Sequence, residues 1–289
     1  MHVIFGLFLS FLLISCFQPK GERREAQDKV SGVLVSDTVK AAGDMNSADI
    51  YEATGGSSDI ASRLPAVMRN ADLPEALCRK LLELSAASNA FYADLLDCLA
   101  GDRHLRELVD KQHPLPSDYV PSDLVTLAGG SYLVNRAGMT LRRAAAVVLE
   151  EMAAAARAEG VTLVVSSTYR SYDYQAEVYN RTVREMGREA ADRESARPGH
   201  SQHQTGLVVD FGSIDDSFAQ TAAGRWMAAN ASRFGWSLSY PDGYEEITGY
   251  RWESWHYRYV GKDLAAFIDN YFGGIQQYAL RFLHEWEAQ

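Results

Sequence analysis

Two short stretches of this sequence hold the side chains that zinc chemistry requires. His203 and Asp210 are separated by six residues that include Gly206, and His256 follows about fifty residues later with Glu253 just before it. Two neutral imidazoles and one carboxylate can hold a catalytic zinc ion and leave one coordination position open for water. We therefore predict His203, Asp210 and His256 as metal ligands, and Glu253 as the general base.

Each of these residues also has a purely structural interpretation. A lone histidine is often a hydrogen-bonding core residue, and Asp210 alone could be a turn residue. Asp210, however, lies within an apolar run, 207–211, that predicts a buried strand, and a buried carboxylate needs a cation or a metal as partner. Positions 253 and 256 would point to opposite faces of a flat strand, so we expect Glu253 to lie in a bend or just before the strand.

The elements around these residues predict an α+β fold. Helical and strand patterns alternate without a regular βαβ series, which favours a small antiparallel sheet that carries the zinc site and is flanked by helices. Thr140 is predicted to cap a helix that ends at Gly160, and a strand is predicted over Val161–Ser166. Ser171 is predicted to cap the next helix, which Gly187 ends.

The same patterns predict the organisation of the chain. Composition, periodicity and proline-rich breaks divide it into the following segments: 1–16, signal peptide with a lipobox cysteine; 17–60, flexible tether; 61–112, N-terminal helical extension; 113–270, domain with the predicted zinc site; 271–289, C-terminal helix.

An export signal is predicted at the N-terminus. Residues 3–15 are apolar, are too short for a comfortable membrane span and lead directly to Cys16, in a pattern that resembles a bacterial lipobox. We expect an exported lipoprotein anchored to the membrane through Cys16, in the periplasm or on the outer face of the cell envelope. Plain secretion and an uncleaved anchor are the alternatives. The formal net charge of −10 disfavours a nucleic-acid partner.

Two further cysteines allow two interpretations. If the segment from Cys78 to Cys98 formed one straight helix, the two residues would lie about 30 Å apart, beyond the reach of a disulfide. A disulfide would therefore require a helical hairpin that turns near residues 85–89, and two buried free thiols are the alternative.

The motifs together resemble the VanY-type zinc D-alanyl-D-alanine carboxypeptidases. This family lies in a fold group with the hedgehog signalling domain and the lysostaphin-type endopeptidases. The resemblance covers about residues 119–265 and rests on the His203 to Asp210 spacing, on Glu253-x-Trp255-His256 and on several other stretches. These are Tyr119-Val120-Pro121, Tyr169-Arg170-Ser171-Tyr172, Gln175, Ser195 to Gly199, Ile247 to Tyr250 and His256-Tyr257-Arg258-Tyr259.

The resemblance implies a zinc enzyme that removes the terminal D-Ala from peptidoglycan stem peptides. It implies that Arg170 stabilises the developing oxyanion and that Gln175 and Ser201 bind substrate. The sequence departs from the family pattern at Gln202, where related sequences often have Glu, and at Val208 and Ser254, which replace Ala and Pro. These changes leave the ligands and the base intact but put the shape of the substrate pocket in doubt.

Two other functions remain open at this point. An L,D-carboxypeptidase would use the same zinc chemistry on tetrapeptide stems and differ only in its pocket. A non-catalytic cell-wall-binding lipoprotein would have no need of the base, so the presence of Glu253 argues against it.

Overall fold

The computed structural model describes residues 57–289. Cys16, the predicted signal peptide and residues 17–56 of the predicted tether lie outside the described residues. Helix α3 begins at Ser57, so the last four residues of the segment predicted as tether belong to a helix. Within 57–289, none of the helices is both long enough and apolar enough to cross a membrane.

A five-stranded sheet carries the predicted ligands, in the strand order β2-β4-β5-β7-β6. Its strands are β2 (Leu133–Val134), β4 (Val164–Ser167), β5 (Val208–Phe211), β6 (Trp236–Leu238) and β7 (His256–Tyr259). The predicted α+β fold is confirmed. The sheet is mixed rather than purely antiparallel, because β4 runs parallel to its neighbour β2. The connection from β2 to β4 contains helix α6, which lets the chain return to the sheet in the same direction.

Strands β5 and β7 give the sheet two chemically different faces. Asp210 pairs with His256 and Val208 pairs with Arg258, so these four side chains share one face. The opposite face packs into a hydrophobic core with helices α6 (Arg143–Ala158) and α9 (Ala222–Asn230). Members of this core include Leu149, Val165, Val209, Phe211, Met227 and Tyr257.

Helix α6 begins later than the sequence predicts. Residues Thr140–Arg142 form strand β3, which pairs antiparallel with β1 (Leu124–Thr126). The carbonyl oxygen of Thr140 also accepts a hydrogen bond from the Tyr169 amide at 3.1 Å. The prediction that Thr140 caps the helix is therefore wrong, because this residue belongs to a strand and α6 begins without a side-chain cap.

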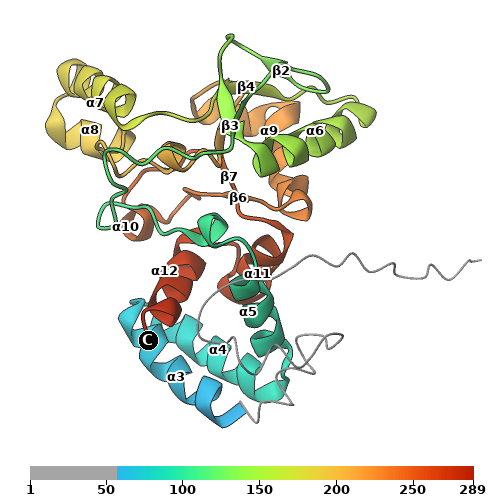
Figure 1. Cartoon of the computed structure of the whole chain (residues 1–289), viewed down its shortest axis with the longest axis vertical. Coiled ribbons are helices and arrows are strands. Elements are labelled where there is room, and N and C mark those ends of the chain that lie inside the picture. Colours follow the sequence, from blue (N-terminus) through green and yellow to red (C-terminus); the bar gives the residue numbers. More distant parts are fainter. Residues whose placement is uncertain (1–56) are drawn as a thin grey trace, which may run out of the picture. The chain divides into compact units, whose positions relative to one another are not determined.

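Five helices from opposite ends of the described chain share a second hydrophobic core. They are α3 (Ser57–Asn70), α4 (Glu75–Ala87), α5 (Ala90–Ala100), α11 (Lys262–Phe272) and α12 (Gln276–Glu287). The rings of Phe91 and Phe267 are buried with centroids 5.7 Å apart. Figure 1 shows the blue to teal helices α3–α5 packed beside the red helices α11 and α12. The N-terminal extension is therefore helical, as predicted, and packs onto the C-terminal helices.

Cys78 and Cys98 are free thiols, so the disulfide alternative is wrong. The chain does turn back between α4 and α5 near Ser88. The Cys78 thiol, however, lies 3.5 Å from the Leu73 carbonyl oxygen, and Cys98 is buried in the helical core. Burial raises the pKa of Cys98 to about 12, so this thiol stays protonated.

Candidate metal centre

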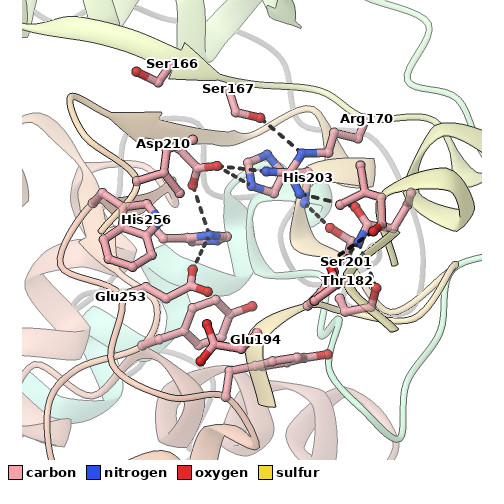
Figure 2. A pocket seen from close by; sticks show the side chains of 18 of the residues that line it. Ser166, Ser167, Arg170, Thr182, Glu194, Ser201, His203, Asp210, Glu253 and His256 are labelled. Atoms are coloured by element: carbon pink, nitrogen blue, oxygen red, sulfur yellow. Dashed lines mark hydrogen bonds and ion pairs between the residues drawn. The ribbon is translucent and has the colours of Figure 1, made fainter. Parts of the chain in front are cut away.

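The three predicted ligands come together from separate elements. His203 lies in the 3₁₀ helix η2 (Gln202–Thr205), Asp210 in β5 and His256 in β7, and all three are buried. One ligand atom from each residue lies within 4.8 Å of the others. Figure 2 shows Asp210 facing the imidazoles of both His203 and His256, with Glu253 on the other side of His256.

The turn between η2 and β5 explains the glycine in the motif. Gly206 has φ +70°, a left-handed conformation that closes η2 and directs the chain into β5. A Cβ atom at this position would lie 2.9 Å from Leu124 and 3.0 Å from Arg142. Glycine thus allows His203 and Asp210 to approach each other from consecutive elements.

His203 is held in the form that a metal requires. Its Nδ1 lies 2.7 Å from the Thr168 carbonyl oxygen, which can only accept, so Nδ1 carries the proton and the Nε2 lone pair faces Asp210 Oδ2 at 3.2 Å. Burial, helped by the charge of Arg170, lowers the pKa of His203 to about 4. The imidazole is therefore neutral at pH 7.

Asp210 and His256 form a buried ion pair when His256 is protonated. Burial alone would raise the pKa of Asp210, but the protonated His256 beside it outweighs burial and helps to hold that pKa well below its usual range. Burial likewise would lower the pKa of His256, yet Asp210 and Glu253 raise it to about 9. His256 Nδ1 lies 3.3 Å from Asp210 Oδ1 and 3.1 Å from Glu253 Oε2. Without a metal, this nitrogen therefore keeps its proton.

This donor set fits a divalent cation. Asp210 is 1% exposed, and among residues 57–289 its Oδ1 atom has no partner in a well-formed hydrogen bond. A buried carboxylate with an unused oxygen and two imidazole nitrogens facing it has the composition of a three-residue zinc site. A metal there would displace the proton from His256 Nδ1.

Glu253 lies just before β7, as the strand geometry requires. The segment turns at Glu253, where the His256 amide donates to the Glu253 carbonyl oxygen at 3.3 Å. The turn places the Glu253 carboxylate and the His256 imidazole on the same side of the chain, where they lie 3.1 Å apart. Burial raises the pKa of Glu253 above its ordinary value, although His256 pulls it down. The carboxylate is thus a stronger base than a solvated glutamate.

Arg170 lies beside the metal centre, at the start of helix α7 (Tyr172–Met186). Ser171 caps this helix by accepting from the Tyr174 amide, as predicted. Arg170 Nη2 donates to Asp210 Oδ2 at 2.8 Å, and its Nη1 donates to Gln175 Oε1 at 3.3 Å. Gln175 therefore orients the arginine that the resemblance places near the reacting carbonyl.

A cavity of about 420 Å³ opens onto the cluster. Its lining includes the predicted residues Arg170, Gln175, Ser201, His203, Asp210, Glu253 and His256. Ser201 Oγ accepts from the His203 amide at 3.3 Å, so Ser201 also supports the loop that carries the ligand. The structure thus brings together all seven residues that the sequence nominated for chemistry.

Other residues of the site escaped the sequence reasoning. A buried polar layer links the ligand loop to the last helix: Gln202 Nε2 donates to Gln276 Oε1 of α12 at 3.3 Å, and Ser239 Oγ donates to Gln202 Oε1 at 2.7 Å. The Ser239 amide also donates to the His256 carbonyl oxygen. Only the unusual Gln202 hinted at this layer, since its partners are distant in sequence.

Comparisons with known proteins agree with this geometry. Residues 138–262 match the VanY family, D-alanyl-D-alanine carboxypeptidase. The chain is 38% identical over 184 residues to YodJ of Bacillus subtilis (strain 168), covering 61% of this chain and 67% of YodJ. It is 32% identical over 167 residues to a D-alanyl-D-alanine carboxypeptidase of Enterococcus faecium, covering 56% and 52%. The matches therefore span about half to two thirds of these curated relatives.

Two solved structures are similar. The LdcB LD-carboxypeptidase, whose structure addressed peptidoglycan recognition, is 38% identical with a TM-score of 0.53, covering 58% of this chain and 85% of that chain. A variant of the vancomycin-resistance D,D-pentapeptidase VanY in complex with Zn(II) is 33% identical with a TM-score of 0.52, covering 62% and 99%.

The first prediction concerns metal content. The purified protein is expected to bind about one zinc ion, and His203→Ala to lose it, because two ligands hold a metal far more weakly than three. His200→Ala is the matched control, since His200 contacts the Asp110 carbonyl oxygen instead of the cluster. Elemental analysis after dialysis measures the result, with circular dichroism to confirm folding. Zinc retained by His203→Ala would contradict the assignment.

The second prediction concerns pH. The pKa of His256 is raised in the folded protein, so its stabilising charge is fully present below about pH 6.5 and is lost as the pH rises towards 9. The free energy of unfolding of the metal-free protein should fall by about 3 kcal/mol across this window relative to that of His256→Gln. Urea unfolding at several pH values after chelation measures the difference, and parallel pH profiles would refute it.

Proposed function

Because the chain belongs to the VanY D-alanyl-D-alanine carboxypeptidase family, we propose that it is a zinc-dependent carboxypeptidase that removes the terminal D-Ala from peptidoglycan stem peptides. The observation that carries this proposal is the buried His203–Asp210–His256 group with Glu253 beside it, on the wall of a cavity large enough for a short peptide. The Zn(II) named for the VanY structure supports zinc as the metal.

Zinc held by His203 Nε2, Asp210 and His256 Nδ1 would acidify water and polarise the scissile carbonyl. Glu253 then acts as the general base. Its carboxylate takes a proton from the attacking water and later delivers a proton to the leaving amine of D-Ala. Its raised pKa suits both transfers near neutral pH, because the group accepts a proton readily and can return it.

Arg170 places a fixed positive charge beside the reacting centre. Its guanidinium is held by Asp210, Gln175 and the Ser167 hydroxyl, so it needs little rearrangement as negative charge develops on the carbonyl oxygen. Gln175 and Ser201 line the same cavity and are proposed to help position the peptide.

The D,D reaction, on stems that end in D-Ala-D-Ala, is our first proposal, in line with the family name. The L,D reaction on tetrapeptide stems is a second candidate, because the 38% identity to LdcB exceeds the 33% identity to VanY. Both reactions use the same metal and base and release D-Ala. A non-catalytic wall-binding protein is disfavoured, since it would not require Glu253 in contact with a ligand.

We also propose that the protein is exported and held in the cell envelope by a lipid on Cys16. The proposal rests on the apolar residues 3–15 that precede this cysteine and on the location of the proposed substrate outside the cytoplasm. Amide-linked and diacyl chains on one cysteine give a stable anchor.

The function is tested with defined muropeptides. The protein should release D-Ala, detected by mass spectrometry as the loss of one residue, and exhaustive chelation should stop the release. Loss from pentapeptides alone supports the D,D reaction, and loss from tetrapeptides supports the L,D reaction. Release that persists in full after chelation would refute the metal mechanism.

Glu253→Gln is the matched variant for this test. It removes the base and keeps the size of the side chain, so kcat should fall by about 10²- to 10⁴-fold while zinc content is unchanged. Undiminished turnover by this variant would remove Glu253 from the catalytic role.

The anchor is tested by labelling. Cells that express the protein should incorporate radiolabelled fatty acid into it, and Cys16→Ala should abolish both the label and the recovery of the protein with membranes. Unlabelled wild-type protein would leave plain secretion as the better interpretation.

A further inference from the structure

The cavity extends beyond the metal centre along helix α7. Tyr174, Val178 and Arg181 line it at helical spacing, which corresponds to about 10 Å of helix. Arg136, two residues after β2, lines the same region. Its guanidinium lies 6.0 Å over the Tyr174 ring, and its Nη1 donates to the Tyr174 hydroxyl at 3.4 Å. Arg136 therefore contacts Tyr174 from a separate element, and Arg181 lines the same cavity two turns further along α7.

These two arginines differ from the others in the cavity. Arg170 contacts Asp210, and Arg251 is paired with Glu194 at 2.6 Å and Asp216 at 2.7 Å. No carboxylate oxygen of residues 57–289 lies within ion-pair distance of Arg136 or Arg181. Both are exposed side chains at the cavity wall, so this end of the cavity is positively charged and open to an anionic ligand.

The positive charge of these arginines changes the pKa of Tyr174. The hydrogen bond from Arg136, together with the charges of Arg136, Arg170 and Arg181, lowers the pKa of Tyr174 in spite of partial burial. Three guanidinium groups thus act on one hydroxyl at the wall of the cavity, and only Arg170 among them also contacts the metal centre.

We propose that Arg136 and Arg181 bind a second carboxylate of the stem peptide, upstream of the scissile bond. The inference rests on the proposed function and names a feature of its substrate. The C-terminal carboxylate lies only one residue, about 3.5 Å, beyond the scissile bond and stays near the metal centre and Arg170. A carboxylate two or three residues upstream can reach the end of the cavity that lies along α7.

A stem peptide offers two such groups. One is the α-carboxylate of its γ-linked D-Glu, and the other is the ω-carboxylate of its diamino acid when that residue is diaminopimelate. Both present the same chemistry to a guanidinium pair. Amidation of either group removes the charge without changing the size of the peptide, so amidated peptides separate the two sources.

The test compares four synthetic stem peptides: unamidated, amidated at either position, and amidated at both. We expect the full-length protein to cleave the unamidated peptide with a kcat/KM about five- to tenfold above that of the doubly amidated one, mainly through KM. In R136Q/R181Q this ratio should fall towards one. R184Q is the matched control, because Arg184 is exposed on the same helix and lies outside the cavity lining.

Each outcome decides the proposal. Sensitivity to one amide alone identifies that carboxylate as the ligand and supports the proposal. A wild-type protein that cleaves all four peptides equally, or a preference that survives in R136Q/R181Q, overturns the inference while the carboxypeptidase function stands. Failure to cleave any of the four overturns the function and the inference together.

Discussion

The cross-strand pair of Asp210 with His256 is the interaction on which the rest of the site depends. It brings a carboxylate and an imidazole to the same face of adjacent strands, and a shift of one residue would turn one of them into the hydrophobic core. His203 and Glu253 then approach this pair from two turns, each directly before one of the paired strands. The helices on the other face secure the register through the packing of Val209 and Tyr257.

The two histidines of the site are held in opposite protonation states. Thr168 and burial keep His203 neutral, whereas Asp210 and Glu253 retain a proton on His256. A metal ion held by His203, Asp210 and His256 would replace that proton with a larger positive charge. The positions of the ligands are therefore already fixed by the protein's own hydrogen bonds and ion pairs.

The sequence predicted the parts of this arrangement that depend on residue type and local spacing. The choice of His203, Asp210 and His256, the Ser171 cap and the position of Glu253 before its strand all follow from short stretches of sequence. Thr140 was misassigned because its strand partner lies across a loop. The Gln202–Ser239–Gln276 contacts and the placement of Arg136 beside α7 could not be predicted, since they join residues 37 to 74 positions apart or arise only from the packing of separate elements.

The contact between Gln202 and Gln276 ties the metal-binding loop to the final helix of the chain. The segment up to β7 contains His203, Asp210, His256 and Glu253 but lacks this support for the loop. The loop therefore gains this contact only when α12 has been added to the fold. The order of the metal-binding loop is thereby coupled to the docking of α12, a helix that contributes none of the three ligands.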